Sequence, residues 1–402
     1  MSDLAKLLAV LALIVFLLNR KWNLGLVLLL ASVLLGLLFA HPAREIISDA
    51  FLAITDWLTL RLVGIVVLIL TLGEILRRTA RLDGMVHALE QLMPDTRIVL
   101  ALVPAFIGLL PMVGGAMFSA PMVGRIGDRL EASEDRKTFV NYWFRHIWEY
   151  VFPLYPSFVV GAALLGLSDQ QATAMLWPLS LVSVLGGVLF GLLGLKPSQQ
   201  IGQRSGALAS LRELALSIWP IGLVLFLTLV VGLDLIISLL LTIALLALVN
   251  RVGVRQFWDI LCHRIRWSTV LVIFGAMLFR RVLEGTGAVA AASQALIQMH
   301  VPVIVAVFAV PFAAGLLSGL GTAAFAIGFP IVLPLIGHSP LEPSLAVWAW
   351  AGGFLGVMMS PAHLCLSLTR VYFQADWGPL YRRIGPAVLL TAAIAGLLLA
   401  FL

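Results

Sequence analysis

With 402 residues, of which 61% are hydrophobic and only 11% charged, and a mean hydropathy of +1.06, the chain is too apolar for a water-soluble protein. This composition predicts an all-helical polytopic protein of the lipid bilayer, because β-barrel strands would alternate polar and apolar residues and these runs do not. The formal net charge of +6 comes from basic residues in short loops, which form no patch with interleaved aromatic residues, so nucleic acid is not expected as a partner.

Apolar runs in chain order predict about ten full membrane spans, each needing roughly 17–25 residues. The runs lie near residues 4–18, 23–40, 60–76, 140–165, 172–195, 213–231, 233–250, 267–283, 343–369 and 384–402. A polar segment in the middle of the chain, 196–212, is the expected cytoplasmic linker. It separates a first unit, 1–195, from a second, 213–402.

Two more apolar segments, 97–124 and 301–337, carry proline and glycine at their centres. Laid side by side, they match Pro104 with Pro311, Gly108 with Gly315 and Gly114 with Gly321. Irregular backbone at membrane depth survives only where it is buried in protein or lines a wet cavity. We therefore expect two re-entrant hairpins that enter and leave on the same side.

The hairpins leave five full spans in each unit, an odd number, so the two copies are expected to insert in opposite orientation as an inverted repeat. With this topology, 20 of the 26 lysines and arginines fall on one side and five on the other, and Arg145 lies in or near the membrane. The positive-inside rule assigns the first side to the cytoplasm. The prediction is a cytoplasmic (inner) membrane protein with both termini outside.

Each hairpin is followed by a span with its own interruption, within 140–165 and 343–369. Proline inside a span, such as Pro153 and Pro361, breaks the helix and frees a carbonyl group. Helix N-termini attract anions, whereas C-terminal ends and unwound carbonyls bind cations. Two hairpin tips and two broken helices are therefore expected to meet near the midplane and to bind an anion together with Na⁺ or H⁺.

The residues nearest these interruptions are the candidate contacts for a solute. They are Gly114, Gly115, Ser119, Ser318, Gly321, Thr322, Ser360 and His363. The alternative for each hydroxyl is a hydrogen bond to the carbonyl four residues earlier in its own helix. The alternative for the glycines is close helix packing.

Glu149 is the candidate for ion or proton coupling, because an acid within a span is a cation or proton site by default. If the helix continues, it lies roughly 12 Å into the span, with His146 and Arg145 on the same face. Asn141 belongs to the same segment. The alternative is an internal ion pair that neutralises charge and fixes the helix.

The two cysteines, Cys262 and Cys365, lie in or beside apolar runs without CxxC spacing. Packing is the expected role, and neither a disulfide nor a zinc site is indicated. No metal and no cofactor are expected beyond the coupling ion.

Three motifs carry a resemblance to an uncharacterised prokaryotic membrane family, a domain of unknown function grouped with the ion-transporter superfamily. They are Gly-Leu-Leu-Pro-Met-Val-Gly-Gly-Ala-Met-Phe-Ser-Ala-Pro at 108–121, Asn-Tyr-Trp-Phe-Arg-His-Ile-Trp-Glu-Tyr at 141–150 and Ser-Pro-Ala-His-Leu-Cys-Leu at 360–366. That superfamily includes divalent anion:sodium symporters and citrate and gluconate permeases. The resemblance implies a homodimer whose hairpins and broken helices move as an elevator. In the sodium–dicarboxylate branch, Ser-Asn-Thr motifs hold the ligands; this chain lacks that triplet, and only the hydroxyls of Ser119, Thr322 and Ser360 correspond.

Together these patterns predict a secondary active transporter, not an enzyme, that moves a small organic or inorganic anion coupled to H⁺ or Na⁺. One alternative is a flippase for a lipid-linked phosphate, with Arg145 binding the phosphate. Another is an intramembrane metal-dependent hydrolase that uses His146, Glu149 and His363. The sequence contains no HExxH motif, which a hydrolase of that common type would carry.

Overall fold

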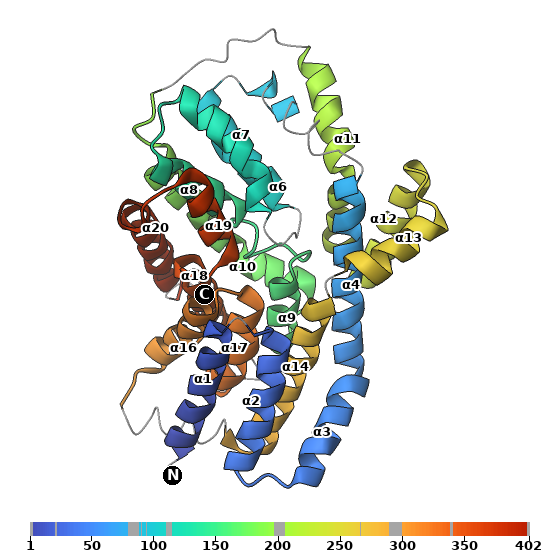
Figure 1. Ribbon diagram of the computed structural model, residues 1–402, viewed down its shortest axis with the longest axis vertical. Coiled ribbons are helices and arrows are strands. Elements are labelled where there is room, and N and C mark those ends of the chain that lie inside the picture. The colour runs from blue at the N-terminus through green and yellow to red at the C-terminus, as the bar shows by residue number, and fades with distance from the viewer. Residues whose placement is uncertain are drawn as a thin grey trace.

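The computed structural model describes residues 3–20, 22–78, 88–89, 91–93, 95–109, 115–196, 206–265, 267–288, 300–337 and 341–399. Within these ranges the chain forms helices and no β-strand (Figure 1). The first part of the chain contains α1 (Asp3–Asn19), α2 (Leu24–Leu38), α3 (Ala43–Thr55), α4 (Trp57–Arg78), α6 (Thr96–Gly108), α7 (Ala116–Arg129), α8 (Glu134–Arg145), α9 (Pro156–Leu164), α10 (Asp169–Gly187) and η1 (Val188–Leu192).

The second part follows residues 197–205, which lie outside the described ranges. It contains α11 (Ala207–Leu225), η2 (Phe226–Val230), α12 (Leu235–Val249), α13 (Val254–Asp259), η3 (Ile260–Arg264), α14 (Trp267–Gly285), α16 (Val303–Ser318), α17 (Gly321–Ile336), α18 (Pro343–Met359), α19 (Leu364–Phe373) and α20 (Trp377–Leu398). Because α11 begins at Ala207, the last residues of the expected linker 196–212 are helical.

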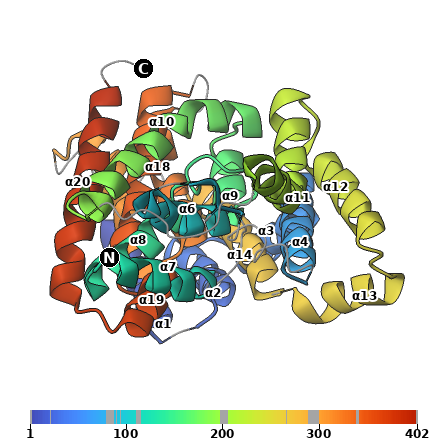
Figure 2. The ribbon, with the colours of Figure 1, turned by 90° about the horizontal axis from the view of Figure 1, so that it is seen from above.

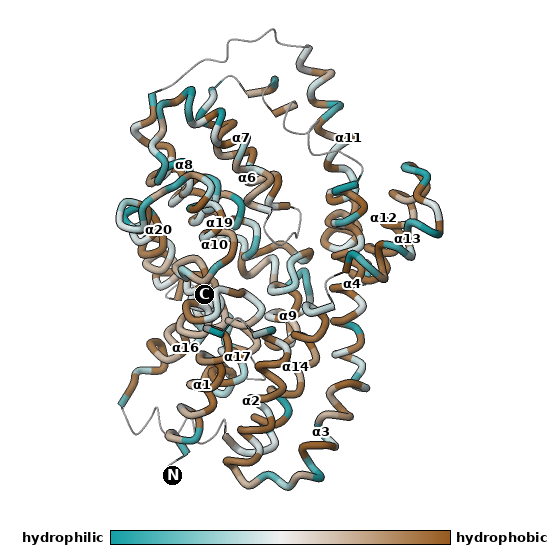
Figure 3. The backbone as a smooth tube through the Cα atoms, viewed as in Figure 1, coloured by the Kyte–Doolittle hydropathy of each residue, from teal (hydrophilic) through white to brown (hydrophobic). Residues whose placement is uncertain are grey.

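Five helical segments in the described ranges are long and apolar enough to cross a membrane, or six if the bent pair α13/η3 and α14 counts as one span. Large apolar side chains also face outward, as on α12, where Leu240 and Leu248 are exposed. Figure 3 shows that α4 and α12 consist mainly of hydrophobic residues. These features are those of a multi-pass helical membrane protein.

The helices lie in two groups (Figures 1 and 2). On one side α12 packs on α4 and α11, with α13 beyond them. On the other side α8, α18, α19 and α20 lie together. The buried side chains form one continuous core that includes residues of both groups.

The contact between α16 and α18 depends on glycine. A Cβ atom at Gly315 would meet the backbone of Gly353, and one at Gly356 would meet the carbonyl of Phe312. Small residues of this kind let two membrane helices approach until their backbones touch. The close approach fixes where α16 ends, next to the start of α19.

Candidate functional site

The residues that flank four interruptions of the helices lie near one another in the interior. The interruptions separate α6 from α7, α8 from α9 (146–155), α16 from α17 (Gly319–Leu320) and α18 from α19 (360–363). α17 packs on α9, and α19 packs on both α7 and α8. Segments from both parts of the chain therefore surround one centre.

Glycines mark two of the contacts between these interruptions. A Cβ at Gly319 would lie 2.6 Å from the backbone nitrogen of His363, and one at Gly321 would lie 2.8 Å from Cβ of Ser157. Gly319 also adopts φ +65°, the left-handed conformation that ends α16. Only glycine fits this position without strain.

Arg145 is the last residue of α8 and is only 2% exposed. Its guanidinium group lies against Gly115, where a Cβ would come within 2.5 Å of Nη2. Gly115 directly precedes α7, whose first N–H groups carry partial positive charge. The expected solute contact Gly114 lies outside the described residues. A buried guanidinium beside a helix N-terminus is an environment that favours an anion.

His146 and His363 form a pair across the two parts of the chain. Nδ1 of His146 is 2.5 Å from the carbonyl oxygen of Tyr142, and Nδ1 of His363 is 2.7 Å from that of Gly319. Because a carbonyl only accepts, each Nδ1 is the protonated nitrogen, and each neutral ring presents a lone pair at Nε2. The two Nε2 atoms are 3.1 Å apart. Two lone pairs at this distance need a proton or a metal ion between them.

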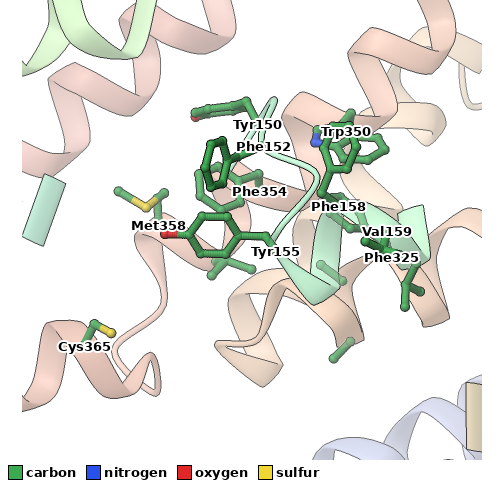
Figure 4. Packing of buried hydrophobic residues seen from close by; sticks show 14 of the residues in the cluster. Tyr150, Phe152, Tyr155, Phe158, Val159, Phe325, Trp350, Phe354, Met358 and Cys365 are labelled. Carbon is green, nitrogen blue, oxygen red and sulfur yellow. The ribbon is translucent and has the colours of Figure 1, made fainter. Parts of the chain in front are cut away.

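Cys365, near the start of α19, belongs to the same cluster. Its Sγ and one ring nitrogen from each of His146 and His363 all lie within 4.8 Å of one another. Figure 4 draws Cys365 with the buried side chains of this region. The expectation that Cys365 only packs therefore missed its two histidine neighbours. The His-x-Cys spacing at 363–365, directly after a Ser-Pro break, was the available signal.

Glu149 is not on a helix, which corrects the expected placement. α8 ends at Arg145, eight residues before Pro153, and residues 146–150 form turns. The carboxylate is nevertheless buried, with Oε1 3.7 Å from Nε2 of His146. Proximity to His146 thus holds for a different reason from helical spacing.

The hydroxyl groups bond to backbone carbonyls. Ser318 donates at 2.6 Å to the carbonyl four residues earlier, Ser119 at 3.2 Å to that three residues earlier, and Ser360 at 2.6 Å to Leu316 of α16. Thr322 lies in the first turn of α17. With their protons used in this way, the three serines have no donor left for an anion, and the hydroxyl oxygens of Ser318 and Ser360 already accept from backbone N–H groups.

Asn141 is fully buried on α8 and bridges three elements. Its Nδ2 donates to the carbonyl of Ala116 at 2.9 Å and to Oγ1 of Thr369 at 3.3 Å. Its Oδ1 has no hydrogen-bond partner among the described residues. A buried acceptor without a partner is costly unless a cation or a donor meets it.

Two tyrosines donate hydrogen bonds to carbonyl groups at the interruptions, and no pattern in the sequence distinguishes them from aromatic residues that only pack. Tyr155 donates to the carbonyl of Gly108 at the end of α6, and Tyr142 donates to that of Met358 at 3.2 Å. Both tyrosines lie in the core (Figure 4 labels Tyr155). They satisfy carbonyls that a broken helix leaves without an internal partner.

A search among curated proteins found no match to this chain. One family, described as "Protein of unknown function (DUF401)", matches it along its full length. With residues 1–402 covered, the chain belongs to the DUF401 family.

Proposed function

We propose that this protein is a secondary active transporter, not an enzyme, that moves a small organic or inorganic anion across the cytoplasmic membrane, coupled to H⁺ or Na⁺. The observation that carries the proposal is the burial of Arg145 at the end of α8. Its guanidinium group is only 2% exposed and lies beside the helix interruptions, where its positive charge attracts an anion. Its place beside Gly115 and the start of α7 adds backbone donors to the same spot.

The pairing of helices supports the proposed inverted repeat. α6 packs on α8 and α7 on α19, and in the same way α16 packs on α18 and α17 on α9. Each proposed hairpin thus contacts one half of each broken helix. This exchange is the arrangement expected if 97–124 and 301–337 are re-entrant hairpins of two inverted units that work by an elevator movement. We further propose a homodimer with both termini outside.

The coupling ion is assigned to the side of the centre formed by α8 and the turns after it. Glu149 supplies a buried carboxylate there, and Asn141 supplies a buried Oδ1 without a partner among the residues described. Oxygen ligands of these two kinds suit a hard cation such as Na⁺. A proton on the carboxylate would meet the same need.

The test is uptake of radiolabelled phosphate, sulfate, citrate and gluconate into proteoliposomes, each with an inward Na⁺ gradient and with an inward proton gradient. We expect one anion to accumulate under one gradient. Arg145→Gln should abolish this uptake, whereas Arg129→Gln, which changes an exposed arginine at the end of α7, should leave it unchanged. Full uptake by Arg145→Gln would exclude the anion-binding role of Arg145.

A thermal shift assay on the detergent-purified protein identifies the ligand independently. A ligand that binds the folded state raises the melting temperature by mass action. A shift that needs both an anion and Na⁺ would identify both partners. No shift with any anion, together with no uptake, would overturn small-anion transport and direct the test to a lipid-linked phosphate.

A further inference from the structure

We propose that His146, His363 and Cys365 bind one thiophilic transition-metal ion, Zn²⁺ being the probe with the matching ligand preference. Zinc takes imidazole nitrogen and thiolate sulfur as ligands, commonly in tetrahedral sites. A resident metal ion goes beyond anion transport and does not depend on it.

The donor atoms have the required spacing. Two nitrogens bound to one zinc ion at about 2.0–2.1 Å lie about 3.3 Å apart at the tetrahedral angle, and the two Nε2 atoms are 3.1 Å apart. The complete set, with Sγ of Cys365, lies within 4.8 Å. Nitrogen and sulfur bound to the same zinc lie about 3.6 Å apart, so a side-chain shift of about 1 Å completes the site.

The carbonyl groups that accept hydrogen bonds from the two histidines also support a metal site. Histidines that bind a metal almost always donate their other ring N–H to a carbonyl or carboxylate, which fixes the ring and the tautomer. His146 does so to Tyr142 and His363 to Gly319. Both rings therefore point their unprotonated Nε2 atoms at one another.

The charges around the three ligands are compatible with a divalent ion. Arg145 Nη1 donates a hydrogen bond of 3.5 Å to Nε2 of His146, which a metal ion would have to displace, while Glu149 Oε1 lies 3.7 Å from the same nitrogen and favours a cation. Zinc binding displaces the proton of the Cys365 thiol, and the resulting thiolate adds a second negative charge. With three protein ligands, a fourth coordination position remains for water or an anion.

The ion would join the two parts of the chain. His146 follows α8, whereas His363 and Cys365 belong to the break before α19 and to α19 itself. All three side chains are at most 9% exposed, so a bound ion would exchange slowly with solvent. Metal bound here would hold the two broken helices together at the centre.

The experiment measures metal on the full-length protein, purified in detergent with its affinity tag removed. Elemental analysis should find about one zinc per chain after growth with zinc. In Cys365→Ser and His363→Gln, zinc affinity should fall by at least about 100-fold, more than the 10- to 100-fold typical of a lost outer partner. Cys262→Ser, which changes the exposed cysteine, should keep full occupancy.

Cobalt gives a signature that a merely structural cysteine would not produce. Co²⁺ loaded into the metal-free protein should show the near-ultraviolet charge-transfer band of a cobalt–thiolate bond. The band should vanish in Cys365→Ser and persist in Cys262→Ser. Cys365→His should restore metal binding without the band, which separates loss of a ligand from loss of folding.

Metal content in the wild type no higher than in Cys365→Ser, with no cobalt band, would overturn the site. The 3.1 Å contact between the histidines would then be a shared proton. Because neither readout involves transport, a zinc-binding protein that moves no anion would refute the proposed function alone. An anion transporter without metal would refute only the metal site.

Discussion

The Nε2 atoms of His146 and His363 lie 3.1 Å apart although 217 residues separate them in the chain. Neither histidine could be placed by its own neighbours in sequence. His146 is positioned by the end of α8, and His363 by Gly319 at the end of α16. The short distance between the two histidines therefore depends on the correct assembly of the helix interruptions.

Replacing the carboxylate next to this pair should uncouple transport. In Glu149→Gln we expect gradient-driven uptake to be lost while anion exchange between equal concentrations and monodispersity persist, because the amide keeps the shape of the side chain but not its charge. Proteoliposome uptake and exchange measure the two activities. Glu131→Gln, at an exposed position, is the control. Unchanged uptake in Glu149→Gln would remove the coupling role.

Adding one methyl group beside Arg145 should impair anion binding. Gly115 has φ −55°, so alanine suits its backbone, but the new Cβ would lie 2.5 Å from Nη2 of Arg145. We expect Gly115→Ala to lower uptake about tenfold, which corresponds to about 1.4 kcal/mol. Gly222→Ala, where a Cβ meets nothing within 4 Å, should have no effect. Equal uptake by both variants would contradict the placement of Arg145.

The end of α16 should tolerate no side chain. Gly319→Ala places a Cβ at φ +65°, which costs about 1–2 kcal/mol, and also within 2.6 Å of the His363 nitrogen. Gly166→Ala has nearly the same φ, +70°, but meets nothing within 4 Å. We expect the melting temperature to fall more in Gly319→Ala than in Gly166→Ala. The difference measures the contact itself, and equal losses would mean that His363 does not lie there.

An ion pair between α8 and α20 should make stability depend on pH. Burial is the largest single effect on Asp135 and opposes its ionisation. The hydrogen bond from Arg383 at 2.5 Å, the hydrogen bond from Ser133, the positive charge of Arg383 and a backbone hydrogen bond together outweigh burial and lower the pKa of the carboxyl. The stabilisation is therefore present above the ordinary aspartate pKa of about 3.9 and is lost as the pH falls through the lowered value. We expect Asp135→Asn to destabilise by at most about 1 kcal/mol at neutral pH, because solvent screens the pair.

Melting temperatures of the wild type and Asp135→Asn should converge as the pH is lowered. Asp376→Asn is the control, because Asp376 is exposed and its side chain accepts no capping hydrogen bond. A difference that stays constant down to the most acid pH would show that the pair with Arg383 contributes no ionic stabilisation.

Proline and glycine patterns located the interruptions of the helices well, because those residues act on the local backbone. The chain breaks at Gly319–Leu320 and at 360–363, within segments selected from sequence. Prolines were less informative one by one: Pro104 and Pro311 lie inside helices. The early end of α8 at Arg145 was missed, since no proline or glycine lies there.

The side-chain cluster could not be predicted to the same degree. Spacing along one helix suggested His146 with Glu149, and that contact exists through a turn. Cys365 joins His146 only because α19 packs on α8, a tertiary contact without a local signal. The hydroxyl groups likewise depend on which carbonyl they meet, as Ser360 does with Leu316.

The exchange of partners between the two parts of the chain also sets the order of assembly during synthesis. α7 is made early, but one of its packing partners, α19, is the last helix but one to leave the ribosome. Until α19 has been made, Arg145 and His146 lack the contacts that this helix provides, and a charged group within the membrane is energetically costly. Ribosomes that stop before α19 should therefore leave fragments that membrane proteases and chaperones recognise, and quality control of this protein should respond chiefly to its last segment.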